Sequence, residues 1–203
     1  MKKLLLGIAA VCLAGFTFAQ DAPLWMRHSV ISPDGTTIAF TYKGDIYTVP
    51  VAGGRAMQIT TNPAYDTAPV WSPDSKRIAF ASDRMGSLDV YIVAKDGGEP
   101  RRLTTHSGSE TPLAFTDAGH VLFSAGIMPS AEAVVFPSNG QFNQVYRVSV
   151  EGGRPTMISS MPMECISINK EGAMLYQDKK GYEDYWRKHH VSPIARVSRA
   201  MGD

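Results

Sequence analysis

The chain has 203 residues, of which 44% are hydrophobic, 9% aromatic and 19% charged, so it is rich enough in apolar side chains to bury a core and is not wholly disordered. Twenty Lys and Arg against nineteen Asp and Glu give a net charge of +1. This balance argues against a protein that binds nucleic acid or an anionic membrane by neutralising phosphates.

Residues 1–19 have the pattern of a secretory signal peptide. Lys2 and Lys3 precede the apolar run Leu4–Phe18, and Thr17-Phe18-Ala19 places small residues where a signal peptidase cuts. The run is shorter than the roughly 20 residues that a spanning helix needs, so an uncleaved anchor is the weaker alternative. We expect export to the periplasm with cleavage near Ala19.

Cleavage at that point also removes Cys12. The bulky Val11 before it does not suit a lipoprotein signal, and the mature chain keeps Cys165 as its single cysteine. An intrachain disulfide is therefore excluded, and stability has to come from packing.

Five short blocks recur in one order, 40 to 44 residues apart, which indicates an internal repeat. The first copy comprises Ser32–Gly35, Ile38–Phe40, Asp45–Tyr47, Gly53–Arg55 and Ile59–Thr61, and the second Ser72–Ser75, Ile78–Phe80, Asp89–Tyr91, Gly97–Glu99 and Leu103–Thr105. A looser third copy runs from Phe115 to Ser159 with an insertion near Gly126–Asn143. A fourth runs from Cys165 through Met174–Tyr176 to Tyr185-Trp186. We divide residues 20–203 into units 24–61, 62–105, 106–160 and 161–203.

In the second unit the sequence predicts four short strands joined by tight turns. Ala68–Trp71 is followed by the turn Ser72–Ser75, in which Pro73 presets the backbone and Asp74 bonds locally. The remaining strands are predicted over Arg77–Ser82, Asp89–Ala94 and, after a turn at Asp96–Glu99, Pro100–Thr104 as the outer strand.

Both faces of these strands are apolar. Ile78 and Phe80 alternate with Ala79 and Ala81, so the sheet has to be covered on both sides. Such units, stacked so that each covers the next, predict an all-β fold, a β-propeller of four-stranded antiparallel blades. About four blades are present, which indicates an incomplete ring. A β-sandwich of irregular hairpins is the alternative.

The sequence contains none of the common motifs for hydrolysis, zinc binding or phosphate binding. Gly-x-Ser-x-Gly, His-Glu-x-x-His and Gly-x-Gly-x-x-Gly are all absent. We therefore assign no catalytic, cofactor-binding or metal-binding residue and expect no cofactor.

The histidines are interpreted as structural or surface residues. His189-His190 is expected to be an exposed hairpin rather than a metal site, because adjacent residues on a strand point to opposite faces. His28, His106 and His120 are predicted to pack at equivalent edges between strands.

Three aspartates, Asp34, Asp74 and Asp117, recur at the same turn. They allow a ring of carboxylates around a cation, but a residue that every copy of a turn needs is better explained by local side-chain to backbone hydrogen bonds. Cys165 lies between apolar strand residues and is expected to be a buried, inert thiol.

Six cations are predicted near strand ends or on outer strands. They form either a solvated rim or a set that steers peptide carboxylates toward a central channel. The six are Arg27, Lys43, Arg84, Arg101, Arg102 and Arg147.

The repeated blocks resemble the WD-repeat-like blades of TolB and of the tricorn-type serine proteases, and the tricorn resemblance is the closer. The similar segments are His28–Gly35, Phe40–Tyr47, Ala64–Trp71, Phe136–Ser138 and Trp186–His190. Together they extend the resemblance from about Leu24 to Arg196.

Tricorn-type proteases continue after their propellers with a PDZ-like module and a catalytic region that carries the Ser and the His. This chain contains neither, so the resemblance implies that it does not cleave peptides alone. After Ala195-Arg196 that family has an Asp-Ile-Trp-like strand, whereas this chain has Val197–Asp203. We expect a truncated or frame-shifted reading frame.

The resemblance implies the non-catalytic amino-terminal propeller portion of an exported tricorn-like serine protease, which recognises or gates peptide substrates. The alternative is a stand-alone TolB-like interaction propeller in the cell envelope. An enzyme that uses the channel itself needs His, Glu and Asp clustered at strand ends, which the sequence lacks.

The expected partners are peptides or protein substrates and the missing downstream protease domains, with an oligomer as a further alternative. Because an open arc exposes strands patterned for burial, we expect the isolated mature chain to be marginally stable or prone to aggregation.

Overall fold

The computed structural model describes residues 25–126, 143–159, 163–169, 173–178 and 195–199. These residues form 15 β-strands, and none of them belongs to a helix that is long and apolar enough to cross a membrane. The predicted signal peptide, the insertion and His189-His190 lie outside the described residues.

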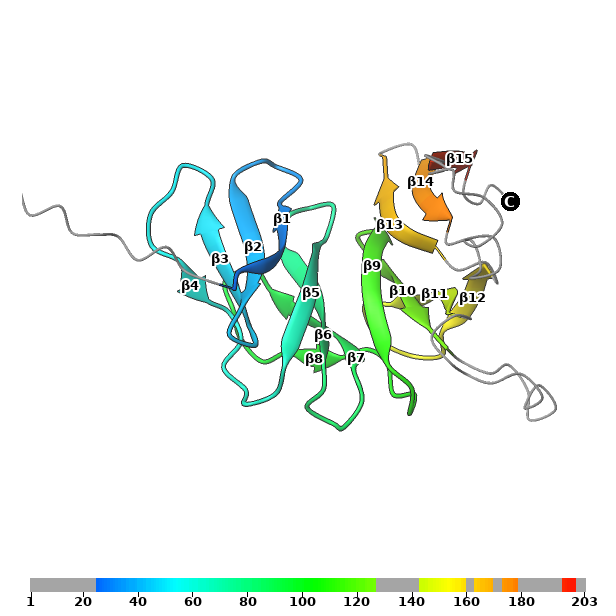
Figure 1. Cartoon of the computed structure of the whole chain (residues 1–203), viewed down its shortest axis with the longest axis horizontal. Helices are drawn as coiled ribbons and strands as arrows, with labels where there is room; N and C mark the ends of the chain where they lie inside the picture. The colour runs from blue at the N-terminus through cyan, green and yellow to red at the C-terminus, as the bar shows by residue number, and fades with distance from the viewer. Residues whose placement is uncertain (1–24, 127–142, 160–162, 170–172, 179–194, 200–203) are drawn as a thin grey trace, which may run out of the picture.

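The strands form four antiparallel sheets in chain order (Figure 1). The first sheet is β1 (Arg27–Ile31), β2 (Thr37–Tyr42), β3 (Asp45–Pro50) and β4 (Met57–Gln58). The second is β5 (Asp66–Trp71), β6 (Arg77–Ser82), β7 (Asp89–Ala94) and β8 (Arg101–Arg102). The third is β9 (Glu110–Asp117), β10 (His120–Ala125), β11 (Gln144–Ser149) and β12 (Thr156–Ser159), and the fourth β13 (Met163–Ile168), β14 (Ala173–Asp178) and β15 (Ala195–Arg199).

The predicted strands of the second sheet are confirmed, except that its first strand begins earlier, at Asp66 instead of Ala68, and its outer strand is shorter. β6 and β7 have the predicted bounds, and β8 covers Arg101–Arg102 instead of Pro100–Thr104. The Leu103 N–H still donates to the Val90 carbonyl at 2.8 Å. The Val90 N–H, however, donates to the Thr104 hydroxyl at 2.9 Å, so a side chain replaces the backbone partner that would have continued the ladder.

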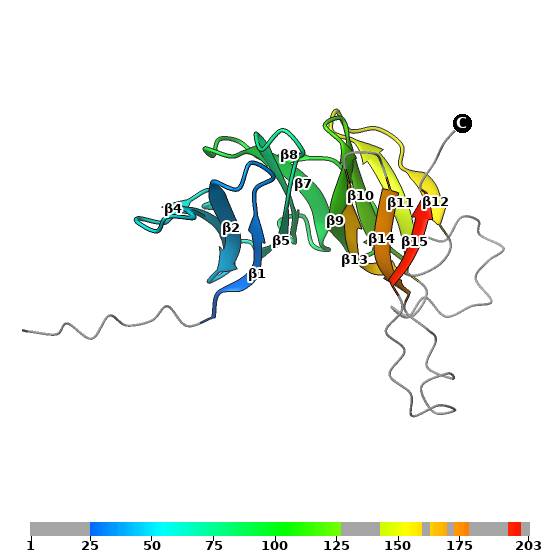
Figure 2. The same cartoon turned by 90° about the horizontal axis from the view of Figure 1, so that it is seen from above.

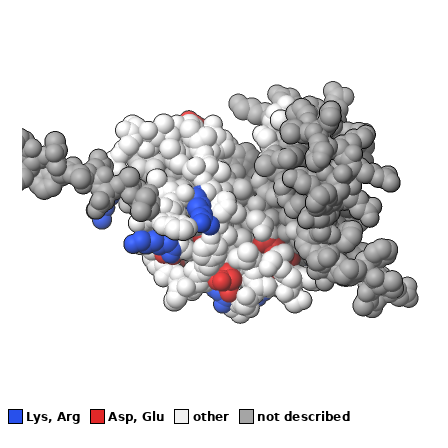
Figure 3. Space-filling view, in the orientation of Figure 1, with Lys and Arg blue, Asp and Glu red and all other residues white. Residues whose placement is uncertain are grey.

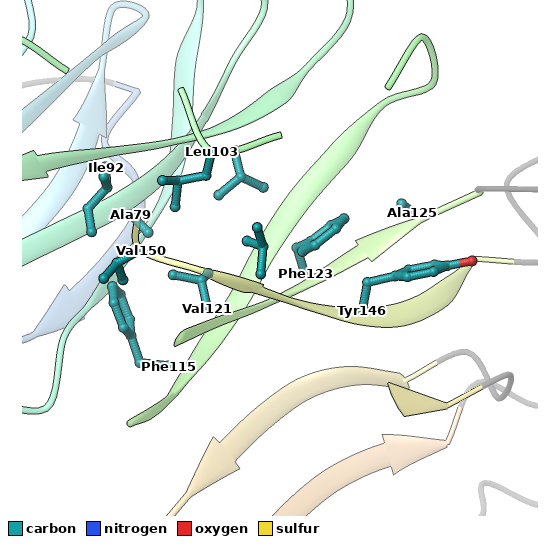
Figure 4. Close-up of a cluster of buried hydrophobic side chains, with 11 residues drawn as sticks. Ala79, Ile92, Leu103, Phe115, Val121, Phe123, Ala125, Tyr146 and Val150 are labelled. Carbon is teal, nitrogen blue, oxygen red and sulfur yellow. The ribbon is translucent and has the colours of Figure 1, made fainter. Parts of the chain in front are cut away.

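The second sheet is covered on both faces, as the alternation predicted. Ile78, Ala79, Phe80 and Ala81 are all fully buried, which confirms that both faces of β6 are packed. One face of the second sheet packs on the first sheet, and its other face packs on the third. The hydrophobic cluster between the second and third sheets is shown in Figure 4. It includes Ala79, Ile92 and Leu103 from the second sheet and Phe115, Val121, Phe123 and Tyr146 from the third.

The sheets follow one another along an open arc. The innermost strands contact in sequence, β1 with β5, β5 with β9, and β9 with β13. In two perpendicular views the first and fourth sheets lie at opposite ends of the arc (Figures 1 and 2). The predicted propeller architecture and the incomplete ring are therefore confirmed.

The fourth sheet differs from the repeat alignment. The alignment continued that unit to Tyr185-Trp186, which lies outside the described residues. Besides β13, the strand that pairs with β14 is β15, in which Ala195–Arg199 runs antiparallel to Ala173–Gln177. The segment where the repeat faded in sequence therefore still forms a strand, because backbone pairing does not require the side chains of the motif.

Candidate interaction site at the strand ends

The strands β5, β7 and β9 each begin with a buried carboxylate, and all three begin at the same end of the sheets. Asp66, Asp89 and Glu110 have no solvent exposure. A buried carboxylate is costly unless it is paired or protonated. The surroundings of these three groups therefore decide how the strand ends are held.

The first junction between sheets satisfies its carboxylates. Arg84 donates to both oxygens of Asp66, at 3.0 and 2.9 Å, and its guanidinium lies 4.5 Å from the centre of the Tyr91 ring. Beside them, Asp45 accepts from Gln58 at 3.0 Å and from the Thr60 hydroxyl at 3.3 Å. Partial burial raises the pKa of Asp45, and these hydrogen bonds oppose that effect.

The equivalent second junction leaves the Glu110 carboxylate without a hydrogen-bond partner, although the Glu110 N–H donates to the Leu88 carbonyl at 2.6 Å. Arg102 takes the place of Gln58, and its Nη2 lies 2.8 Å from Asp89 Oδ2 as an ion pair without hydrogen-bond geometry. Both oxygens of Glu110 are buried and unpaired. Burial raises the pKa of Glu110 to about 7 and the Asp89 charge adds to this, while the Thr104 hydroxyl and the Arg102 charge oppose it.

At the same end of the first sheet, exposed cations and aromatic rings gather in one place. We call this group the cationic corner, and it consists of Trp25, Arg27, His28, Tyr42, Lys43 and Tyr65. Arg27 Cζ lies 5.1 Å from the centre of the Trp25 ring, and Lys43 Nζ lies 5.4 Å from that of Tyr42. Arg27 pairs in register with Thr41, which places it beside the turn that carries Lys43.

Hydrogen bonds fix the loops of the cationic corner to one another. The Asp66 N–H donates to the Gly44 carbonyl at 2.7 Å, and the Tyr65 N–H donates to Asp83 Oδ1 at 2.7 Å. These bonds connect the β2–β3 turn, the loop before β5 and the β6–β7 loop. His28 Nδ1 lies 3.1 Å from the Thr67 hydroxyl and links β1 to β5.

Three residues of the corner have left-handed backbone conformations. Trp25, His28 and Lys43 have φ values of 76°, 51° and 52°. A non-glycine residue with positive φ is uncommon, and such strain is often found at binding sites. His28 lies within the β-bulge between Arg27 and Val30, and Ala68 has the same φ of 51° in the equivalent bulge of β5, so the repeated bulge accounts for the backbone conformation of His28.

The corner can bind an anionic group next to an apolar one. A guanidinium and an ammonium supply charge-assisted donors for a carboxylate, and the rings supply flat apolar surface. In the view of Figure 3, Lys and Arg side chains lie on the part of the surface formed by the first two sheets, with Asp and Glu side chains beside some of them.

The structure separates the six predicted cations. Arg27 and Lys43 are exposed at strand ends, as predicted. Arg84 and Arg102 instead serve buried carboxylates, and Arg101 reaches the third sheet to pair with Glu151 at 2.9 Å. The expectation for Arg147 was wrong, because it is half-buried within β11, whose neighbours are β10 and β12.

The described histidines do not occupy equivalent positions, in contrast to the prediction. His106 lies in the loop before β9, where its Nδ1 accepts from the Gly108 N–H at 3.0 Å. His120 begins β10 and its Nδ1 lies 3.0 Å from Asp117.

Within the described ranges no three His, Cys, Asp or Glu residues are grouped as metal ligands. The backbone of Cys165 lies in β13, but the burial predicted for its thiol is not described.

The turn role of the repeated aspartates is confirmed. Asp34 Oδ1 accepts from the Thr36 N–H at 3.0 Å and from Ser32 Oγ at 2.5 Å, and Asp74 Oδ1 makes the equivalent bonds. These bonds lower the pKa of both carboxyls. In Asp117, burial opposes the bonds from His120 and the Gly119 N–H, and the net pKa is still lowered.

Sequence reasoning missed the aromatic members of the corner and the buried carboxylates. The repeat offered a signal for the latter, because Asp45 and Asp89 are matched, as are Thr60 and Thr104. Trp25 and Tyr65 stand outside the matched blocks. The proximity of Tyr65 to the turn that carries Lys43 depends on how the first two sheets meet.

The fold defines the class of protein. Antiparallel sheets that are stacked face to face along an arc are the blades of a β-propeller. Residues 23–198 match the family model described as the Tricorn protease N-terminal beta propeller domain. The chain belongs to that family.

Two curated relatives are similar over parts of the chain. Tricorn protease homolog 1 of Streptomyces coelicolor is 35% identical over 102 residues, 50% of this chain and 9% of that protein. The Tol-Pal system protein TolB of Bordetella pertussis is 44% identical over 55 residues, 27% of this chain and 13% of that protein. The aligned regions are thus small parts of both relatives.

Solved structures show the same fold at lower identity. TolB from Acinetobacter baumannii has a TM-score of 0.58 at 19% identity, and the match covers 76% of this chain and 38% of that one. The tricorn protease has a TM-score of 0.55 at 12% identity, and the match covers 80% of this chain and 20% of that one.

Proposed function

We propose that this chain is the non-catalytic propeller portion of an exported tricorn-like serine protease, and that it recognises or gates peptides for proteolysis. The observation that carries the proposal is the family match over residues 23–198. The similarity to a tricorn protease homolog supports it. The sequence pattern of residues 1–19 supports a periplasmic location.

Within this function the cationic corner is the site that receives the peptide. Arg27 and Lys43 are exposed and lie over aromatic rings, whereas Arg84 and Arg102 are engaged with buried carboxylates. Asp45, two residues after Lys43, bonds to Gln58 and Thr60 instead of neutralising the corner. A peptide with a free carboxylate next to an apolar side chain has the complementary chemistry.

Peptide binding can be measured by fluorescence anisotropy with two labelled peptides that share an apolar sequence. One ends in acidic residues and a free carboxylate, and the other is neutral and amidated. We expect the acidic peptide to bind more tightly, and the double substitution Arg27→Ala and Lys43→Ala to weaken its binding at least roughly tenfold.

The matched control removes two cations from the other end of the strands, Arg55→Ala and Arg154→Ala. Both are exposed and lie in the β3–β4 and β11–β12 connections. Equal losses in the two double variants, or equal binding of the two peptides, contradict the role of the corner.

The protease assignment has a separate test. Reading the DNA downstream of the Asp203 codon in all frames is expected to show a PDZ-like segment and a Ser-bearing protease region. Unrelated sequence in every frame contradicts the assignment and favours a stand-alone TolB-like interaction module. The 44% identity to TolB over 55 residues supports that second candidate.

A further inference from the structure

The exposed apolar side chains at the strand ends of the first two sheets extend beyond the cationic corner. Trp25 and Tyr65, which belong to the corner, are 72% and 42% exposed, and Met85 in the β6–β7 loop is 66% exposed. All three lie at the end of the sheets where β1, β5 and β7 begin. Exposed apolar side chains that adjoin one another on a surface mark binding sites, whereas single ones need no explanation. The position of Met85 relative to the corner therefore decides its role.

The loop before β5 joins the corner to the β6–β7 loop. The ring of Tyr65 lies against the β2–β3 turn, because its Cδ2 is 3.5 Å from the position that a Cβ on Gly44 would occupy. The Tyr65 N–H donates to Asp83 Oδ1 at 2.7 Å, and Asp83 begins the turn that carries Met85. The three loops that carry Lys43, Tyr65 and Met85 therefore lie side by side.

The β6–β7 turn holds Met85 in a fixed position. The Gly86 N–H donates to the Asp83 carbonyl at 2.8 Å and closes the turn. Arg84, next to Met85, is fixed by its ion pair with Asp66. A residue on a fixed turn loses little backbone entropy when a ligand covers it, so Met85 is pre-organised for contact.

Charge is distributed unequally along these three loops. At the corner, Arg27 and Lys43 are exposed, and neither forms an ion pair with a described residue. At the other end Arg84 is engaged with Asp66, and the carboxylate of Asp83 is adjacent. A ligand carboxylate is therefore attracted to the corner and repelled from the β6–β7 loop.

We propose that Met85 is the second contact of the peptide site, and that it receives an apolar side chain on the amino-terminal side of the peptide's last residue. The corner binds the terminal carboxylate and the apolar side chain next to it, and the peptide runs over Tyr65 toward the β6–β7 loop. The ligand class is thus a peptide with a free carboxyl terminus that follows an apolar segment. This inference rests on the proposed function.

The spacing of the sheets indicates where in the peptide that side chain lies. The β2–β3 and β6–β7 loops are equivalent loops of adjacent sheets, and sheets packed face to face lie about 10 Å apart. An extended chain advances about 3.3 Å per residue. A peptide with apolar residues at the second, third and fourth positions before its last residue therefore covers the distance to Met85.

A lipid surface is the other partner that exposed Trp, Met, Arg and Lys side chains fit. The charge of this chain favours the peptide. The net charge is +1, and acidic side chains lie beside some of the cations in Figure 3. Anionic membranes attract clusters of about four to eight basic residues, and the corner has only Arg27 and Lys43.

Two labelled peptides of equal length test the proposal by fluorescence anisotropy with the 203-residue chain. They share the same apolar last residue and free carboxylate. The second, third and fourth positions before it are leucine in one peptide and serine in the other. We expect the leucine peptide to bind roughly tenfold more tightly. In Met85→Ser this advantage should fall to within about twofold, with the affinity for the serine peptide unchanged, and Met85→Leu should retain the advantage.

Val51→Ser is the matched control. Val51 is 46% exposed in the β3–β4 connection at the opposite end of the strands, so its substitution should change neither affinity. Arg27→Ala with Lys43→Ala should weaken the binding of both peptides by the same factor, because both peptides carry the carboxylate. Circular dichroism confirms that each variant is folded.

The outcomes distinguish this inference from the proposed function. If binding depends on Arg27 and Lys43 but is equal for the two peptides, the role of Met85 is overturned and the peptide site at the corner stands. A leucine advantage that Met85→Ser leaves intact has the same meaning. If the double variant binds both peptides as well as the unsubstituted chain does, the peptide site at the corner is contradicted, and this inference with it.

Sedimentation with vesicles of phosphatidylglycerol and phosphatidylethanolamine tests the lipid alternative. We expect no binding of the chain to these vesicles. Binding that Met85→Ser weakens would assign the surface to a membrane and overturn the proposal.

Discussion

Among the carboxyl groups of the described residues, Glu110 has the pKa that its environment raises most. It begins β9, it is fully buried, and both of its oxygens lack a hydrogen bond. Its pKa rises from 4.5 to about 7. Below pH 4.5 the group is protonated in the folded and unfolded chain alike. Between pH 4.5 and about 7 the folded chain binds more protons, so the free energy of unfolding falls with rising pH and then levels off.

Glu110→Gln should therefore stabilise the chain at high pH and leave it nearly unchanged at low pH. Relative to the unsubstituted chain, we expect a gain on the order of 3 kcal/mol at pH 8 and little difference at pH 4. Urea unfolding at the two pH values measures this. Glu151→Gln is the control, because Glu151 is exposed and its pKa is lowered, by Arg101 first. A gain for Glu110→Gln that is equal at both pH values contradicts the raised pKa.

The repeat matched Asp45 with Asp89, but it did not match Asp66 with Glu110 and did not show how any of these carboxylates is paired. Asp66 and Glu110 occupy the same position in successive sheets, yet Arg84 binds Asp66 and no described side chain hydrogen-bonds Glu110. Arg84 comes from the β6–β7 loop, which the repeat alignment does not match between units. The difference in pairing between Asp66 and Glu110 therefore arises from the β6–β7 loop, whose geometry no repeated motif specifies.

Among the elements, the turn between the first two strands of a blade, such as the β5–β6 turn, shows most directly why the same residue types recur in each unit. In the second sheet Asp74 Oδ1 accepts from Ser72 Oγ at 2.6 Å and from the Lys76 N–H at 3.1 Å. Ser72 Oγ also accepts from the Arg77 N–H at 2.9 Å. One carboxylate therefore organises both sides of the turn.

Asp74→Ala should destabilise the chain by about 1–2 kcal/mol, because two local hydrogen bonds to a charged acceptor are lost. Thermal unfolding measures the loss. Asp96→Ala is the control in the β7–β8 turn, where the exposed carboxylate pairs with Lys95. If a ring of aspartates held a cation instead, calcium would raise the melting temperature and EDTA would lower it. We expect neither change.

Strand positions were predictable where the repeat was strict. β6 and β7 were predicted to the residue, because alternation and turn chemistry agree there. β8 was predicted too long, since the Thr104 side chain takes over a backbone bond. β15 was missed, because Ala195–Arg199 carries none of the blade motif and only pairing with β14 defines it.

At the scale of the whole molecule, the sequence predicted the stacked sheets and the open arc, and the structure identifies residues that this openness exposes. Ile31 and Leu175 are exposed although their equivalents Trp71 and Ala79 are buried. Composition alone could not locate them, because exposure here depends on position in the stack and not on the type of side chain.

The central claim is that the first and fourth sheets of one chain do not pack together. Electron–electron double resonance tests it with spin labels at Val51→Cys and Asn169→Cys, in a background with Cys12→Ser and Cys165→Ser. An excess of unlabelled chain ensures that only distances within one chain are measured. The pair Val51→Cys and Lys95→Cys reports the distance between adjacent sheets. We predict a clearly longer distance for the first pair than for the second, and equal distances would show that the chain closes on itself and would contradict the account.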